Sequence, residues 1–199
     1  MPGRDGEGSL LLIHHAARCH PALPPNSLAG LRACAQARAR LVEIDVQPLA
    51  DGDLALLHDP RLEEATTGHG PVGRQTARAL EALRLVWRGR PTDEPVGLLS
   101  RAVSLVRGQA YPHELQLDLK VHPTAPARGE ALRSLATLVA PLGGRVRVSS
   151  TADWALRRLH ALAPELALGF DPLLYLELRP ADQERDAPPY RVGAYGYRD

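Results

Sequence analysis

Two acidic residues inside a short apolar segment offer the clearest chemistry in this sequence. Glu43 and Asp45 alternate with Val42, Ile44 and Val46. The side chains of a β-strand repeat every two residues, so both carboxylates point to one face. Two carboxylates that close repel each other unless a positive charge lies between them. A hard divalent cation, Mg²⁺ or Ca²⁺, meets that need through oxygen ligands. Arginines from the surrounding protein are the alternative.

A second strand-like segment, residues 115–120, repeats the pattern. Its polar face carries Gln116, Asp118 and Lys120, and its apolar face carries Leu115, Leu117 and Leu119. Asp118 offers a third oxygen ligand for the same cation. The ammonium of Lys120 either neutralises a phosphate oxygen as a point charge or forms a salt bridge with Asp118 or Glu43. The residues alone leave both interpretations open.

Two histidines stand at the ends of predicted strands. His14 ends the segment 9–14, and His58 ends the segment 53–58. Imidazoles titrate near neutral pH, so a pair of them can serve as general acid and general base. The sequence does not assign which histidine is which, and a structural role is the alternative for each. Of the remaining histidines, only His15 has a comparable place, because it neighbours His14.

Strands and helices alternate along the chain in a way that positions these groups. We predict strands at 9–14, 41–47, 53–58, 115–120, 145–149 and 166–170. We predict a first helix that Asn26 or Ser27 caps and that runs to about Arg38. Further helices are predicted at 76–85, 96–107, 127–139 and 152–163. This alternation favours a parallel sheet with helices outside it. Polar residues on one face of successive strands suit the inside of a barrel near its mouth, where such folds carry their chemistry.

The composition excludes several classes of protein. The chain has 199 residues, 44% hydrophobic residues and a formal net charge of +1. Nucleic-acid and membrane-surface binding both favour a clear basic excess, so neither is expected. No apolar run is long enough to span a membrane or form a signal-peptide core. Cys19 and Cys34 make no disulfide framework and are expected to be inert. We therefore expect a cytoplasmic protein.

In combination, the motifs resemble the glycerophosphodiester phosphodiesterase family. The family opens with His-Arg-Gly and Pro-Glu-Asn-Thr segments, and here Ile13-His14-His15-Ala16 and Pro24-Pro25-Asn26-Ser27 stand in those places. Its Glu-x-Asp strand is similar to residues 42–46, and its Asp-Gly to His-Asp-Pro segment to residues 51–60. Its Glu-x-Lys strand is similar to Asp118-Leu119-Lys120. Each motif alone is weak, but their shared order over residues 10–171 is specific.

The resemblance implies a TIM-type (β/α) barrel with an insertion after the third strand, at about 59–95. It also implies roles for the residues already singled out. These are His14 and His58 as catalytic histidines, Glu43, Asp45 and Asp118 as metal ligands, and Lys120 and His15 as phosphate contacts. His15 stands where the family has an arginine, and it lacks the bidentate fork of that side chain. Asp118 is one methylene shorter than the usual glutamate but offers the same oxygens.

The chain is short for such a barrel, which usually needs about 250 residues. Too little sequence follows Phe170 for two more strand–helix units. We therefore expect residues 1–199 to form one domain whose barrel is truncated after about six strands. An open parallel edge is a pairing hazard. A gene fragment, an unusual closure or a homo-oligomer that covers the edge would each account for the length.

The resemblance implies a hydrolase that releases sn-glycerol 3-phosphate and an alcohol from a small glycerophosphodiester. The cofactor would be Mg²⁺ or Ca²⁺, and no nucleic-acid or membrane-spanning partner is expected. Two alternatives remain open at this point. One is a truncated, inactive barrel that at most binds phosphodiesters. The other is a lysophospholipid phosphodiesterase of the sphingomyelinase D-like type.

Overall fold

The main sheet of the protein is parallel and open. The computed structural model describes residues 11–122 and 129–172. The parallel strands run in the order β1-β2-β6-β7-β8, and among the described residues β1 and β8 are the two edges. They are β1 (Ile13–His14), β2 (Leu41–Pro48), β6 (Glu114–Leu119), β7 (Val146–Ser150) and β8 (Ala167–Phe170). The predicted TIM-type architecture is confirmed as a partial barrel. The first residues of predicted segments 9–14 and 127–139 lie outside the described ranges.

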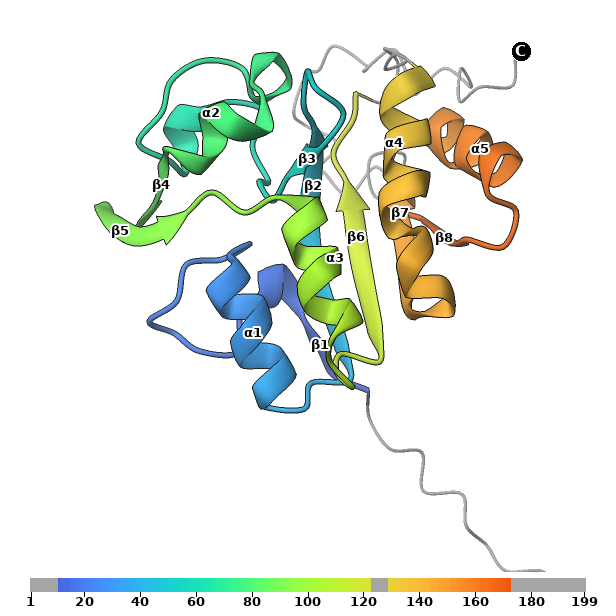
Figure 1. The fold of residues 1–199 in the computed structure, drawn as a ribbon, viewed down its shortest axis with the longest axis horizontal. Helices are drawn as coiled ribbons and strands as arrows, with labels where there is room; N and C mark the ends of the chain where they lie inside the picture. Colours follow the sequence, from blue (N-terminus) through green and yellow to red (C-terminus); the bar gives the residue numbers. More distant parts are fainter. Residues whose placement is uncertain (1–10, 123–128, 173–199) are drawn as a thin grey trace, which may run out of the picture.

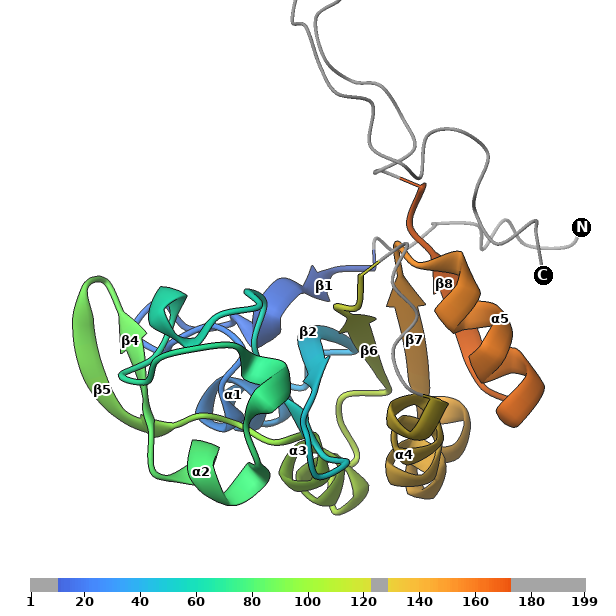
Figure 2. The ribbon, with the colours of Figure 1, turned by 90° about the horizontal axis from the view of Figure 1, so that it is seen from above.

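Four α-helices cover one face of this sheet, as Figures 1 and 2 show. They are α1 (Leu28–Gln36), α3 (Leu99–Arg107), α4 (Gly129–Val139) and α5 (Asp153–Leu162). Side chains of β2 and β6 such as Ile44, Leu115 and Leu117 are fully buried against them in the main core. The alternate residues of these strands are polar and point to the other face. The predicted two-faced strands are therefore confirmed.

The third strand differs from the sequence-based expectation of a parallel strand at 53–58. The strand β3 (Leu54–Ala55) is two residues long and pairs antiparallel with the end of β2, with Gln47 opposite Ala55. The reason is the turn at Asp51 and Gly52, where Gly52 has a φ of 93°. A connection that short can join only antiparallel strands, since parallel strands need a long crossover. The parallel part of the sheet thus has one strand fewer than predicted.

Residues 59–95 form the predicted insertion, which has more order than expected. It contains α2 (Ala77–Glu81) and a two-stranded sheet of β4 (Arg84–Trp87) and β5 (Arg90–Pro95). The predicted helix at 76–85 ends early because this hairpin begins at Arg84. Its turn residues, Arg88 and Gly89, both have positive φ, as a tight two-residue hairpin requires. The insertion packs around its own cluster of buried apolar side chains, among them Leu62, Leu80 and Leu85.

Short 3₁₀ helices complete the connections. They are η1 (His15–Ala17), η2 (Leu62–Glu64), η3 (Val72–Arg74) and η4 (Ala140–Arg145). Within 11–122 and 129–172, no helix has the length and apolar character needed to cross a membrane. Both edge strands carry an exposed apolar side chain, Ile13 of β1 at 47% and Phe170 of β8 at 49% exposure. The expectation that a second copy covers an edge remains a prediction.

A single glycine controls how closely α1 packs on the loop after β1. A Cβ atom at Gly30 would lie 2.7 Å from the carbonyl oxygen of Ala17 and 3.0 Å from Oγ of Ser27. In a helix, Gly→Ala normally stabilises by about 1 kcal/mol. Here we expect Gly30→Ala to lower the free energy of unfolding by about 1–3 kcal/mol, because backbone has to move. Urea unfolding measures the change.

Gly108→Ala is the matched control for this prediction. At the carboxyl end of α3, the added Cβ would meet nothing closer than 3.8 Å. Gly108 also has an ordinary φ of −82°. The control should therefore be neutral or stabilising. Equal, small effects at both glycines would show that the close approach of α1 to Ala17 is not a constraint.

Candidate active site

Three carboxylates from two neighbouring strands meet on the polar face of the sheet. The register of β2 and β6 places Asp45 opposite Asp118, and Glu43 lies two residues earlier on the same face. One oxygen from each of Glu43, Asp45 and Asp118 lies within 4.8 Å of the others. Asp45 and Glu43 are buried, at 2% and 6% exposure, whereas Asp118 is half-buried. The sequence-predicted acidic group is thus brought together by the parallel register.

The loop after β1 holds Glu43 with its backbone. The N–H of Ala16 donates a hydrogen bond of 2.7 Å to Oε2 of Glu43. Ala16 and Ala17 both have a φ of 52°, the left-handed region that costs an alanine about 1 kcal/mol. The carbonyl of Ala16 accepts a hydrogen bond from the N–H of Asn26, which helps to hold this shape. The loop therefore bears backbone strain at the point where it meets the carboxylates.

Asn26 holds the second carboxylate, a role that sequence reasoning missed. Its Nδ2 donates to Oδ2 of Asp45 at 2.7 Å, and its Oδ1 accepts from the N–H of Asp45 at 3.0 Å. Sequence had left open whether Asn26 or Ser27 caps α1. In the structure Ser27 is the cap, since its Oγ accepts from the N–H of Gly30. Asn26 is therefore free to turn inward, and its φ of 53° suits an asparagine.

Asn26→Gly is expected to weaken cation binding at the acidic cluster by about 10- to 100-fold. Glycine tolerates the positive φ, so this change removes the two hydrogen bonds without adding backbone strain. The N–H of Asp45 then loses its partner in a buried place, which costs about 1–3 kcal/mol of folding stability. Calorimetric titration with Mg²⁺ and with Ca²⁺, together with urea unfolding, measures both effects. Unchanged affinity would mean that Asn26 does not orient Asp45 for a ligand.

Lys120 lies against the same carboxylates. Its Nζ is 2.7 Å from Oδ2 of Asp118 and 3.0 Å from Oδ1 of Asp45. Burial by itself lowers the pKa of Lys120, but the hydrogen bond that its Nζ donates to Asp118 and the charge of Asp45 outweigh it, so the pKa is raised. The ammonium therefore stays charged. The salt bridge that sequence left open is present, and its partners are Asp118 and Asp45 rather than Glu43.

The cluster meets the physical requirements of a hard cation. Oδ1 of Asp45 is buried and has no hydrogen bond of good geometry, although the charge of Lys120 lies 3.0 Å away. Burial raises the pKa of Glu43, the N–H of Ala16 lowers it, and the charges of Asp45 and Asp118 raise it further. A bound divalent cation would give the buried Oδ1 of Asp45 a further positive partner and offset the repulsion among the three carboxylates. A donor set made only of carboxylate oxygens suits Mg²⁺ or Ca²⁺.

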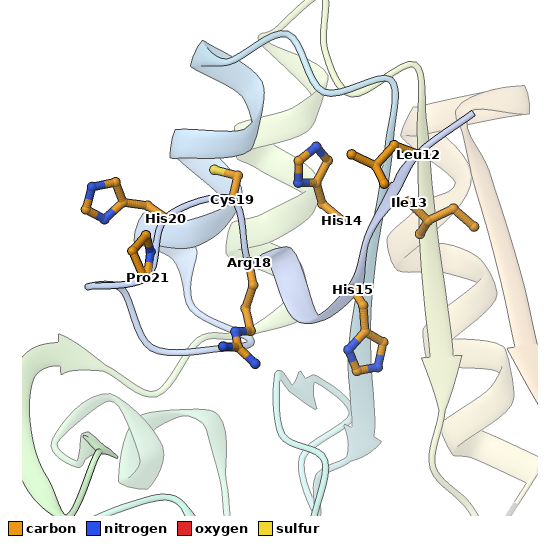
Figure 3. A pocket seen from close by; sticks show the side chains of 8 residues that line it. All are labelled: Leu12, Ile13, His14, His15, Arg18, Cys19, His20 and Pro21. Atoms are coloured by element: carbon orange, nitrogen blue, oxygen red, sulfur yellow. The ribbon is translucent and has the colours of Figure 1, made fainter. Parts of the chain in front are cut away.

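The two adjacent histidines point in opposite directions. Nε2 of His15 lies 3.6 Å from Oε2 of Glu43, and its side chain is 77% exposed. Figure 3 shows the ring of His15 on the side of the loop that faces the insertion and the end of β2, whereas the ring of His14 points the other way. Among the described residues, His14 makes no ion pair with the carboxylates. The structure thus brings His15, and not His14, to the acidic cluster.

His58 follows β3 at the start of the insertion. Its Nδ1 lies 3.0 Å from Oδ1 of Asp59, and its side chain is 60% exposed. Gln47, on the polar face of β2, donates hydrogen bonds to the carbonyls of Leu57 and Asp59. The strand that carries the carboxylates therefore also anchors the backbone on both sides of His58. Sequence reasoning did not single out Gln47, although its place on the polar face of β2 was visible.

The two cysteines stand apart from this chemistry. Burial raises the pKa of the Cys34 thiol to about 12, and its contact with Cys19 adds to the shift. Cys34 is therefore protonated at neutral pH and is not a nucleophile.

Fold and site together define a TIM-type barrel protein with an acidic cluster toward the carboxyl ends of its strands. The sequence profile of the Glycerophosphoryl diester phosphodiesterase family matches residues 18–182. The chain belongs to this family. His14 and His15 precede the matched range.

Curated relatives agree with this assignment. Two proteins of Mycobacterium tuberculosis, from strains CDC 1551 / Oshkosh and H37Rv, are each described as probable glycerophosphodiester phosphodiesterase 1. Each is 31% identical to this chain over 169 residues, which cover 76% of this chain and 61% of the relative. The chain thus spans about 61% of the length of these relatives.

Solved structures of the family have the same fold. A glycerophosphodiester phosphodiesterase from Agrobacterium tumefaciens is 26% identical, with a TM-score of 0.64, over 78% of this chain and 64% of its own. A phosphodiesterase from Oleispira antarctica, solved in complex with the product sn-glycerol-3-phosphate, is 28% identical, with a TM-score of 0.62. That similarity covers 79% of this chain and 64% of the Oleispira chain.

Proposed function

We propose that this protein hydrolyses glycerophosphodiesters to sn-glycerol 3-phosphate and an alcohol, with Mg²⁺ or Ca²⁺ as cofactor. The observation that carries the proposal is the convergence of Glu43, Asp45 and Asp118 within 4.8 Å, in a chain that belongs to this family. The product complex of the Oleispira relative supports the choice of substrate class. Glu43, Asp45 and Asp118 would hold the cation. When bound, it would supply positive charge to a phosphate oxygen and so stabilise the charge that develops at phosphorus.

Lys120 adds the second positive charge in this proposal. Its ammonium lies against Oδ1 of Asp45 and Oδ2 of Asp118, the same oxygens that a cation would use. A cation held by these oxygens would compete with Lys120 for both carboxylates. The ammonium of Lys120 would then be available to a phosphate oxygen as a point charge.

Two histidines exchange protons with the substrate. One deprotonates the nucleophile, which is water or a hydroxyl of the substrate's own glycerol, and the other protonates the leaving alcohol. His58 is one of the pair. The sequence pattern points to His14 as the other, but the contact of His15 with Glu43 favours His15. We therefore propose His15 and His58 as the acid–base pair and His14 as a residue outside it.

The direct test is release of sn-glycerol 3-phosphate from glycerophosphocholine by the 199-residue chain. The assay is run with Mg²⁺, with Ca²⁺ and with EDTA, and lysophosphatidylcholine serves as the second substrate. We expect release from glycerophosphocholine with at least one cation and none with EDTA. Turnover of lysophosphatidylcholine alone would move the activity to the lysophospholipid class. No turnover of either by the folded chain would indicate a barrel that at most binds phosphodiesters.

A further inference from the structure

An aromatic side chain of the insertion is flanked by two arginines. Trp87, at the end of β4, has the guanidinium carbon of Arg18 5.2 Å from its ring centre and that of Arg88 5.8 Å away. The indole Nε1 donates a hydrogen bond of 3.5 Å to the carbonyl of Pro21. Arg18 and Pro21 belong to the loop after β1, so Trp87 connects the insertion to the loop that holds Glu43. Cation–π contacts of this kind restrain a guanidinium without neutralising it.

Arg18 lies two residues after Ala16, whose N–H contacts Glu43. It lines an open cavity of about 500 Å³ together with His14, His15, Cys19 and His20. In Figure 3 the guanidinium of Arg18 and the ring of His15 lie on the same side of the loop, both directed away from His14. His15 also contacts Glu43, so the cavity and the acidic cluster share this residue. Arg18 therefore adds a positive charge to a cavity that adjoins the acidic cluster through His15.

The guanidinium of Arg18 has no acidic partner within the described parts of the chain. Several other arginines do: Arg61 pairs with Glu63, Arg101 with Glu81 and Arg147 with Glu114. Arg18 is exposed, and its guanidinium rests on the face of Trp87. An unpaired guanidinium that is already held in place loses less rotamer freedom when it binds an anion. Phosphate is the anion that its planar fork matches best.

We propose that Arg18 binds the phosphate group of the substrate and of the product, and that Trp87 positions it. This inference rests on the proposed function for the identity of the anion, a phosphodiester before the reaction and a phosphate monoester after it. The phosphate contact then comes from two elements: Arg18 on the loop after β1 and Lys120 after β6. Arg88, on the same indole but in the hairpin turn, lies outside the cavity lined by Arg18 and is not part of the contact.

Product binding tests this without requiring turnover. Calorimetric titration of the full chain with sn-glycerol 3-phosphate, in the presence of Mg²⁺, gives the dissociation constant. We expect Arg18→Gln to raise it about 10- to 100-fold, as the loss of charge-assisted hydrogen bonds predicts. Arg18→Lys should recover part of the loss. Arg88→Gln is the matched control, because it removes the same charge from beside the same ring. The dissociation constant of this variant should stay within about 2-fold of the wild-type value.

The positioning role of Trp87 has its own readout. Trp87→Leu should weaken product binding, but less than Arg18→Gln does. Trp87→Phe should bind the product more tightly than Trp87→Leu, because phenylalanine keeps an aromatic face for the guanidinium. Urea unfolding of each variant confirms that it is folded. An equal loss of binding in Trp87→Leu and Trp87→Phe would overturn the positioning role.

Other outcomes separate this inference from the proposed function. Wild-type affinity in Arg18→Gln, or an equal loss in Arg88→Gln, would overturn the role of Arg18. Failure of the wild type to bind sn-glycerol 3-phosphate with either cation would overturn it as well. If the wild type binds the product and Arg18→Gln does not, but glycerophosphocholine is not hydrolysed, Arg18 remains the phosphate contact and the proposed hydrolase activity is rejected.

Discussion

Asp45→Asn is expected to lower hydrolysis of glycerophosphocholine by about 1000-fold and to abolish thermal stabilisation of the protein by Mg²⁺ or Ca²⁺. Asp45 is the most buried member of the cluster, at 2% exposure, and Asn26 donates to its Oδ2 while the Lys120 ammonium faces its Oδ1. An amide there removes one negative charge and weakens a site built from carboxylate oxygens. Thermal unfolding with a saturating cation and with EDTA, beside the turnover assay, measures both effects.

Asp93→Asn is the matched control for Asp45→Asn. Asp93 is an exposed carboxylate in β5 of the insertion and lies outside the acidic cluster. The same chemical change should there leave turnover and cation stabilisation unaltered. If Asp45→Asn keeps full stabilisation by the cation, the cluster of Glu43, Asp45 and Asp118 is not the cation site.

The pH dependence of cation stabilisation follows from Glu43. Burial, with the charges of Asp45 and Asp118, raises the pKa of Glu43 in the folded protein. A carboxyl group whose pKa is higher in the folded than in the unfolded protein lowers the free energy of unfolding once it ionises. In the cation-free protein the penalty is absent at low pH and appears as the pH rises from the ordinary glutamate range through the raised pKa. A bound cation removes it, so stabilisation by Mg²⁺ should grow with pH across that window and not stay constant.

The fold was largely predictable because its strands carry two-faced patterns. Glu43 and Asp45 alternate with buried valine and isoleucine, and Asp118 alternates with buried leucines. This two-residue repeat predicts a β-strand and also which of its faces is polar. The register that sets Asp45 opposite Asp118 was not predictable from that spacing. It is set by the parallel pairing of two strands that are about 70 residues apart in the sequence, which is a tertiary contact. The residue pattern offered Asp118 as a third ligand, and the resemblance to a family implied the same three residues.

The misses have local causes. The β4–β5 hairpin was not predicted from the sequence. Its turn, Arg88-Gly89, indicates a hairpin only when the residues on either side are recognised as strands. Asn26 was weighed as a helix cap, and its true partner, Asp45, lies 19 positions away in the sequence. Whether His14 or His15 belongs to the acid–base pair stays a prediction. His14 is the last residue of β1 and His15 the first of η1, and of their two rings only that of His15 contacts Glu43 among the described residues.

His15→Ala and His58→Ala are each expected to lower kcat by about 100- to 10,000-fold, while cation affinity stays within a few-fold of the wild type. Neither imidazole is needed to hold a hard cation, which prefers oxygen. When Nδ1 of His58 carries the proton and donates to Asp59, Nε2 is left free to accept one from the reaction. His15 reaches the cluster through Nε2, 3.6 Å from Glu43. Turnover kinetics and calorimetric titration with Mg²⁺ separate the two quantities.

His14→Ala is the control that decides between the adjacent histidines. Its ring points away from the side on which His15 and Arg18 lie, so its loss should change kcat by less than about 3-fold, as for a group outside the reaction. The reverse result, an inactive His14→Ala and an active His15→Ala, would return the catalytic role to His14 and require the loop after β1 to rearrange when substrate binds. An equal loss of turnover and cation affinity in His58→Ala would remove the acid–base role, because a proton-transfer group acts on the barrier and not on the binding of the metal.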